Sequence, residues 1–115
     1  MIQGSGIDII EIDRIQKAIE RWGDGFLNHI FTVPEIEHAQ KYKFPYPHYA
    51  GRFAVKEAIF KAVGIPELSW HDVTILNDKD GKPYCVFHHI EFKHRLIISI
   101  SHTRYYAVAS AIVEK

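Results

Sequence analysis

The chain has 115 residues, of which 47% are hydrophobic, and this length and composition predict one compact domain and exclude a disordered segment. The 14 lysines and arginines balance 14 aspartates and glutamates, so the formal net charge is zero, which argues against a nucleic-acid-binding protein. No apolar run approaches the ~20 residues that crossing a bilayer requires, and the N-terminus lacks the pattern of a signal peptide. A single cysteine, Cys85, forms no internal disulfide, so we expect a cytoplasmic protein without a membrane partner.

The first part of the chain predicts one strand followed by helices. Residues 3–11 are an apolar run that two glycines open and Asp8 interrupts, which predicts a β-strand. A helix is expected over residues 13–22, with isoleucines on one face and cations on the other, and Asp24-Gly25 should end it. After a short helical turn, the sequence from Thr32 to Glu35 has the form of a capping box with proline in the first turn, which predicts a helix ending near Tyr42.

The segment 51–64 predicts the main helix, because it is filled with alanine, lysine, glutamate and phenylalanine and ends at Gly64, a residue suited to a left-handed C-cap. The stretch 44–47, with two prolines, predicts a stiff loop that leads into it. Apolar residues make one stripe of this helix, and four charged residues share the remaining surface: Arg52, Lys56, Glu57 and Lys61. One carboxylate among three cations would suit a phosphate-bearing substrate held through a metal ion. The alternative is a solvated face with i,i+4 ion pairs.

The rest of the chain predicts antiparallel strands. Residues 70–76 and 84–88 flank the turn at Asp80-Gly81 and predict a hairpin. After a polar segment, residues 96–101 and 106–113 predict a second pair of strands. Helices come first and strands mostly later, so we predict an α+β fold in which an antiparallel sheet packs with helices in a single domain over residues 1–115.

Two polar residues stand out within these strands. A carboxylate in the apolar surroundings of Asp8 either has a buried hydrogen-bond partner or binds a metal ion. Proteins often hold Mg²⁺ with only one or two carboxylates, and Asp8 with Glu57 would supply such a site. His102, at a strand end beside Thr103 and Arg104, is either a histidine with a local hydrogen bond or a phosphate ligand. The 8 histidines show no spacing typical of zinc sites.

Several short motifs, in order and over nearly the whole chain, resemble the holo-acyl-carrier-protein synthases, the small bacterial type of 4′-phosphopantetheinyl transferase. The matching residues are 6–15, 31–35, 52–58, 81–83 and 99–102. The resemblance implies the fold of that family and its reaction, in which coenzyme A donates 4′-phosphopantetheine to a serine of apo acyl carrier protein and adenosine 3′,5′-bisphosphate leaves. It implies a place in fatty acid biosynthesis.

The same resemblance implies a role for each matching residue. Asp8 and Glu57 would hold Mg²⁺ against the pyrophosphate of coenzyme A, and Ile10 stands where larger members of the superfamily have a third carboxylate. Glu57, directly or through a water molecule, would accept the proton of the serine, and Lys61 would stabilise or protonate the leaving group. Arg52 and His102 would bind the 3′-phosphate end of coenzyme A. Further coenzyme A contacts are implied for Lys56, Lys61, Gly64, Ser69, Asp80, Gly81, Lys82, Pro83 and Thr103.

The resemblance also implies partners. The cations Arg14, Lys17 and Arg21 would form a basic face that docks the acidic acyl carrier protein. Members of the family are commonly homotrimers with active sites between subunits, and the alanine-rich residues 105–113 would suit subunit packing or, equally, an ordinary core. Two other functions remain open at this point: a metal-dependent hydrolase of coenzyme A or nucleotides that uses the same ion, and a non-catalytic coenzyme A-binding module.

Overall fold

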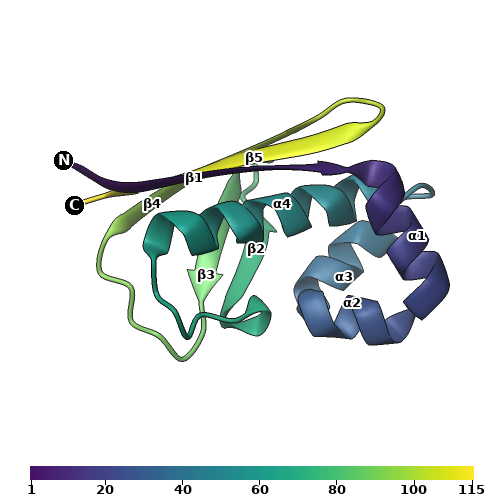
Figure 1. The fold of residues 1–115 in the computed structure, drawn as a ribbon, viewed down its shortest axis with the longest axis horizontal. Helices are drawn as coiled ribbons and strands as arrows, with labels where there is room; N and C mark the ends of the chain where they lie inside the picture. The colour runs from purple at the N-terminus through teal and green to yellow at the C-terminus, as the bar shows by residue number, and fades with distance from the viewer.

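The computed structural model describes residues 1–115 and combines four α-helices with two antiparallel sheets, so the predicted α+β class is confirmed (Figure 1). The elements are β1 (Ile2–Glu11), α1 (Ile12–Trp22), α2 (Asp24–Ile30), α3 (Val33–Gln40), α4 (Tyr46–Val63), the 3-10 turn η1 (Trp70–Asp72), β2 (Val73–Asn77), β3 (Pro83–Phe87), β4 (Arg95–His102) and β5 (Tyr106–Glu114). None of the helices combines the length and the apolar character that crossing a membrane requires.

The larger sheet has the order β1-β5-β4, and β2 and β3 form a separate hairpin. The predicted hairpin and the predicted second pair of strands are therefore confirmed, whereas the pairing of β1 with β5 was not predicted. This pairing sets Asp8 opposite Ala109 and brings the two ends of the chain together, where the Lys115 amide donates to the Met1 carbonyl at 3.0 Å. In Figure 1, α4 lies along one face of this sheet, and α1, α2 and α3 gather near its first turns.

Two glycines of β1 allow the strand to lie directly on α4. A Cβ atom at Gly4 would lie 2.1 Å from the carbonyl oxygen of Ala62, and one at Gly6 would lie 2.0 Å from that of Ala58. Backbone atoms cannot be displaced as a flexible side chain can, so only glycine permits this approach. The glycines that open β1 thus set the distance between Asp8 and α4.

The apolar stripe of helix α4 predicted one buried side, but the structure buries the helix on more than one side. Tyr49 and Ala58 are buried as expected, but Arg52 and Lys56, which we expected on the surface, are only 5% and 0% exposed. The larger sheet covers one side of the helix, while α3 and β2 contact another. The expectation of a solvent-facing charged surface is therefore wrong for these two cations.

A buried ion pair replaces that expected surface. The Lys56 Nζ lies 2.7 Å from Glu35 Oε1, and both side chains are fully buried. The remaining hydrogen bonds of the pair go to the backbone: Lys56 donates to the carbonyls of Ile30 and Trp70, each at 2.9 Å, and Glu35 accepts from the amides of Thr32 at 2.8 Å and Ile75 at 2.7 Å. The pair therefore joins the ends of α2 and α3 to α4, η1 and β2.

Several boundaries differ from those predicted. Helix α4 begins at Tyr46 instead of residue 51, because proline is tolerated in the first turn of a helix, where its missing N–H needs no partner. The break after α1 falls at Gly23, whose φ of 56° is left-handed, and Asp24 already belongs to α2. The predicted capping box at Thr32 is confirmed, as is the left-handed C-cap at Gly64 with φ of 69°.

Candidate active site

Asp8 and Glu57 are far apart in the sequence, but Asp8 lies where β1 crosses α4, near enough for its charge to act on Glu57. Lys61, one turn after Glu57, places its Nζ 3.3 Å from Asp8 Oδ1 and donates to the carbonyl of Ile7 at 2.9 Å. Lys61 thus pairs with Asp8 on the neighbouring strand. A depression of about 280 Å³ opens beside Asp8 and Lys61. Two carboxylates and one ammonium group are therefore gathered at the surface between a strand and a helix.

The carboxylates of Asp8 and Glu57 favour the binding of a cation between them. Burial, and then the negative charge of Asp8, raise the pKa of Glu57, while Lys61 lowers it. Like-charged carboxylates repel each other unless a cation lies between them. The side chain of Asp8 is 18% exposed and that of Lys61 is 52% exposed. A pair of partly hydrated carboxylates is the donor set that Mg²⁺ favours, since this ion keeps several waters and substrate oxygens. The residues present fit a magnesium site.

The close approach at Gly6 yields the first prediction. We expect Gly6→Ala to destabilise the fold by about 1–3 kcal/mol, because the new methyl group would collide with the Ala58 carbonyl and push β1, with Asp8, away from α4. Guanidinium unfolding and the activity of the variant would both report the shift. The matched control is Gly25→Ala in α2, where nothing lies within 4 Å of the added Cβ. Equal stability of the two variants would contradict the proposed contact.

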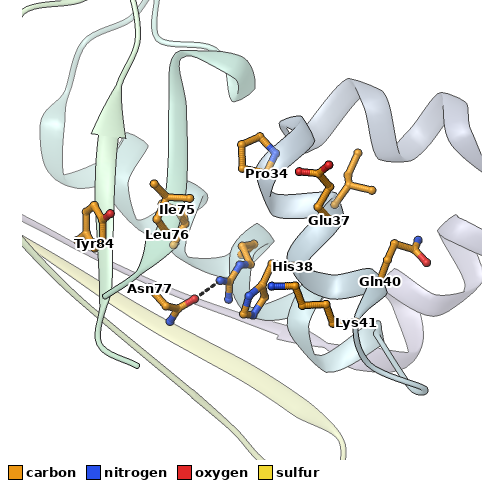
Figure 2. A pocket seen from close by; sticks show the side chains of 11 residues that line it. Pro34, Glu37, His38, Gln40, Lys41, Ile75, Leu76, Asn77 and Tyr84 are labelled. Carbon is orange, nitrogen blue, oxygen red and sulfur yellow. Dashed lines mark hydrogen bonds between the residues drawn. The ribbon is translucent and has the colours of Figure 1, made fainter. Parts of the chain in front are cut away.

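A second site element lies in a cleft of about 730 Å³ between α3 and the β2–β3 hairpin (Figure 2). Arg52 lines this cleft and donates a hydrogen bond to Asn77 Oδ1, the dashed line in Figure 2. Its Nε–H is buried and has no acceptor. Asn77 in turn donates to the carbonyl of Gly81 at 2.9 Å. A guanidinium that lines a cleft is suited to binding an anion there.

The turn between β2 and β3 is attached to Arg52 through Asn77. Asp78 Oδ1 accepts hydrogen bonds from the amides of Asp80 at 2.8 Å and Lys82 at 3.0 Å, and Gly81 adopts a left-handed φ of 85°. Asp80, Gly81 and Lys82 are exposed, and Pro83 begins β3. The structure thus brings this turn and Arg52 together, although 28 residues separate Arg52 from Asp80 in the sequence.

Two other predicted nucleotide contacts lie beyond the opposite end of α4. Gly64 ends the helix, three turns after Arg52, and its amide donates to the carbonyl of Phe60. Ser69 caps η1, where both its amide and its hydroxyl donate to Asp72 Oδ2, at 2.9 and 3.1 Å. The predicted coenzyme A residues therefore extend along the length of α4, with Glu57 and Lys61 between the two groups.

His102 ends β4 as predicted and is exposed. Its Nδ1 lies 3.3 Å from the Thr103 carbonyl, a local contact like the one that the alternative interpretation expected. Thr103 Oγ1 accepts from the amides of Tyr105 at 3.3 Å and Tyr106 at 3.2 Å, which closes the β4–β5 turn. The positive charge of His102 also lowers the pKa of His48, one turn before Arg52 on α4. His102 is therefore within electrostatic reach of the Arg52 region.

Lys56 requires a correction. Its ammonium is fully buried, and its hydrogen-bond partners are Glu35, Ile30 and Trp70. An ammonium group has three donors, so none is left for a phosphate. The expected direct contact of Lys56 with coenzyme A is incompatible with this position, and its role is to hold α4 in place.

The basic face of α1 is exposed, as predicted, but its cations are not equivalent. Lys17 pairs with Asp13 at 2.8 Å. Arg21 lies over the ring of Trp22, with 4.9 Å between its Cζ and the ring centroid, and neither Arg21 nor Arg14 pairs with a carboxylate. Arg14 lines a separate depression of about 750 Å³ with Phe44 and other residues. Arg14 and Arg21 are thus the cations available to an acidic partner.

Sequence reasoning missed two residues that line the Arg52 cleft. Asn77 ends β2 immediately before a turn, and in the sequence it was indistinguishable from an ordinary turn residue. His38 was one of several scattered histidines. No local pattern could have placed either of them against Arg52, because that contact depends on how α3 and the β2–β3 hairpin pack around α4.

Comparison with known proteins identifies the family of this chain. The model of the 4′-phosphopantetheinyl transferase superfamily matches residues 4–111. The holo-[acyl-carrier-protein] synthase of Protochlamydia amoebophila is 46% identical over 119 residues, covering 97% of this chain and 98% of the relative. The holo-[acyl-carrier-protein] synthase of Chlorobaculum parvum is 45% identical, covering 95% and 96%.

Solved structures give the same result. The crystal structure of a holo-(acyl-carrier-protein) synthase from Bacillus anthracis in complex with CoA (3′,5′-ADP) has a TM-score of 0.88 and 39% identity, over 99% of this chain and 97% of that one. The Helicobacter pylori synthase in complex with coenzyme A has a TM-score of 0.85 and 32% identity, over 96% and 99%. The chain therefore belongs to the 4′-phosphopantetheinyl transferase superfamily and, within it, to the holo-acyl-carrier-protein synthases, which are transferases.

Proposed function

We propose that residues 1–115 form a single phosphopantetheinyl transferase domain, which transfers 4′-phosphopantetheine from coenzyme A to a serine of apo acyl carrier protein. Adenosine 3′,5′-bisphosphate leaves, the reaction depends on Mg²⁺, and the enzyme serves fatty acid biosynthesis in the cytoplasm. The observation that carries this proposal is that Asp8 of β1 pairs with Lys61 of α4, and that both charges act on Glu57, one turn before Lys61. Support also comes from the relatives, which are named holo-[acyl-carrier-protein] synthase, and from the coenzyme A complexes of two similar structures.

The reaction exchanges one phosphorus–oxygen bond for another. Asp8 and Glu57 would hold Mg²⁺, which when bound neutralises charge on the pyrophosphate and on the departing group. Glu57 accepts the proton of the serine hydroxyl as the serine oxygen attacks the β-phosphorus. Lys61, partly exposed beside Asp8, stabilises the negative charge of the leaving bisphosphate and supplies a proton to it.

Coenzyme A would lie along α4, with its 3′-phosphate at Arg52 and its pyrophosphate at Lys61. The position of Arg52 in the wall of the cleft supports the first contact. His102 and Thr103 at the end of β4, and the turn from Asp80 to Pro83, would surround the nucleotide. Gly64 and Ser69, beyond the other end of α4, would border the site on the far side of Lys61.

The basic face of α1 would dock the carrier protein. We expect Arg14→Glu to raise the KM for acyl carrier protein about tenfold and to leave the KM for coenzyme A within about twofold, because a charge reversal on a docking face weakens only the interaction with the acidic partner. Steady-state kinetics with each substrate varied in turn would measure both. Lys17→Glu is the matched comparison; a smaller effect is expected because Lys17 already pairs with Asp13. Equal increases in both KM values would show that α1 does not dock the carrier.

We also propose that the protein assembles as a homotrimer with active sites between subunits. The alanines of β5 face inward and are buried, so their small size serves the packing of the sheet on α4 within one subunit. The opposite face of the sheet is uncovered and carries exposed isoleucines among serines: Ile7 is 67% exposed, Ile9 61% and Ile97 37%. Covering this face with other copies of the chain would remove apolar surface from water. Light scattering in solution gives the molar mass that tests the assembly.

One experiment tests the proposed transfer directly. Apo acyl carrier protein, incubated with this chain, coenzyme A and Mg²⁺, should gain the mass of one phosphopantetheine, and the gain should disappear when the metal is chelated. Release of the bisphosphate at the same rate without carrier would instead favour a hydrolase. Binding of coenzyme A with neither reaction would favour a non-catalytic module. The joint presence of Asp8, Glu57 and Lys61 favours the transferase, because a simple binding module needs no base beside a metal ion.

A further inference from the structure

His38 lines the same cleft as Arg52 and is half-buried in its wall. In Figure 2, His38 and Lys41 lie beside the guanidinium that is hydrogen-bonded to Asn77. An anion in the cleft that reaches the guanidinium of Arg52 therefore also meets the imidazole of His38. The proposed function gives no task to this histidine.

A stack of rings holds His38 in place. The ring of His48, from the first turn of α4, lies parallel to that of Tyr42, with 3.6 Å between centroids and an interplanar angle of 17°. The ring of His38 meets that of His48 edge to face, at 5.7 Å and 72°, and lies 5.5 Å from that of Tyr42. Three rings, from α3, the loop after it and α4, thus constrain one another next to the cleft.

The charged groups that shift the pKa values of the two imidazoles are cationic. Burial, then Arg52, His48 and Lys41, lower the pKa of His38; burial, then Arg52 and His102, lower that of His48. The titratable groups around the pair or on the same cleft wall are Glu35, Glu37, Lys41 and Tyr42 of α3 and the loop after it, Arg52 of α4, Tyr84 of β3 and His102 of β4. Both shifts favour the neutral imidazole while no anion is present.

We propose that His38, supported by the stacked His48, is a further determinant of specificity for the 3′-phosphate of coenzyme A, and that it takes up a proton from solvent when this phosphate binds beside Arg52. The proposal rests on the proposed function, which assigns the 3′-phosphate to Arg52. A phosphate dianion reverses the sign of the local field, so the charged imidazole becomes the favoured form and donates a charge-assisted hydrogen bond. Dephospho-coenzyme A, which lacks the phosphate, gives no such uptake.

The contribution of His38 to phosphate affinity should depend on pH. Phosphate binding raises the pKa of His38, so the affinity that its charged form adds is present at lower pH and is lost as the pH rises through the pKa of the bound state. The preference for coenzyme A over its dephospho form should therefore fall between about pH 6 and about pH 8. A phosphate monoester itself titrates near pH ~6. The titration of the phosphate affects the wild-type protein and the His38→Gln variant equally, so comparing the two proteins isolates the contribution of His38.

Calorimetry of adenosine 3′,5′-bisphosphate binding, in two buffers with different heats of ionisation, counts the protons taken up. We expect a measurable uptake near pH 6.5 for the wild-type protein and close to none for His38→Gln, with an affinity about tenfold weaker. Adenosine 5′-monophosphate should bind both proteins with the same affinity within about twofold. His29→Gln is the control, because this histidine is exposed on α2, and it should behave as wild type.

A second measurement needs no variant and covers the case in which His38→Gln does not fold. Titration of the imidazole resonance of His38 by NMR should give a higher pKa with adenosine 3′,5′-bisphosphate than without it. An unchanged pKa, or equal proton uptake by wild-type protein and His38→Gln, would overturn the role of His38. These results would leave the transfer to acyl carrier protein untouched. Failure of the proposed function would instead appear as an absence of that transfer.

Discussion

Glu57→Gln is expected to abolish the transfer of phosphopantetheine while the protein stays folded. The amide keeps the size of the side chain but removes both a metal-binding charge and the group that accepts the serine proton. Loss of a general base alone typically lowers the rate by about 10²–10⁴-fold, and the weakened metal site should add to this. Mass spectrometry of the carrier under single-turnover conditions measures the rate.

Stability separates a catalytic effect from a folding effect in this variant. Burial and Asp8 raise the pKa of Glu57, which means that its carboxylate is disfavoured in the folded protein before any cation binds. The neutral glutamine should therefore be as stable as the wild type without metal, or slightly more stable. Glu67→Gln, an exposed acid after α4, is the control and should keep full activity. A Glu57→Gln variant with near-normal turnover would remove the basis of the proposed mechanism.

The geometry of the metal-binding pair could be anticipated only in part from the sequence. The strand at residues 3–11 and the helix at 51–64 were readable from their periodicity, and the glycines at positions 4 and 6 were visible at the start of the strand. The sequence did not show why these glycines are needed. They allow the close backbone contact with Ala58 and Ala62 that brings Asp8 against α4. A glycine in a strand can indicate that another part of the backbone approaches closely, but it does not show which helix or strand that is.

The prediction that Lys56 is exposed was wrong for the same reason, because a long-range contact decides its position. A charged residue on a helix is usually exposed, and Lys56 was read in this way. Its burial depends on Glu35, which the sequence identified only as the second half of a capping box. That carboxylate serves both purposes, since one oxygen accepts the Thr32 amide and the Lys56 ammonium while the other accepts the Ile75 amide. A local motif can therefore hide a long-range contact made by the same side chain.

Glu35→Ala is expected to destabilise the protein by about 3–5 kcal/mol, because it leaves the buried ammonium of Lys56 without its counter-charge. Burial already lowers the pKa of Lys56, and Glu35 opposes that effect. Without Glu35 the lysine should lose its proton at a lower pH. Guanidinium unfolding at neutral pH measures the loss. The exposed pair of Asp13 and Lys17 is the control, and Asp13→Ala should leave the midpoint nearly unchanged.

The double variant Glu35→Met with Lys56→Met shows how much of this loss comes from the unpaired charge. Its cost should be smaller than the sum of the costs of the two single changes, since no charge is left buried. It should nevertheless stay below wild type, because the amides of Thr32 and Ile75 and the carbonyls of Ile30 and Trp70 lose their side-chain partners. Strictly additive costs would mean that the two side chains stabilise the fold independently. A double variant as stable as wild type would mean that these backbone groups find other partners. The Glu35–Lys56 pair would then not be what joins α2, α3 and β2 to α4, the helix that carries Glu57.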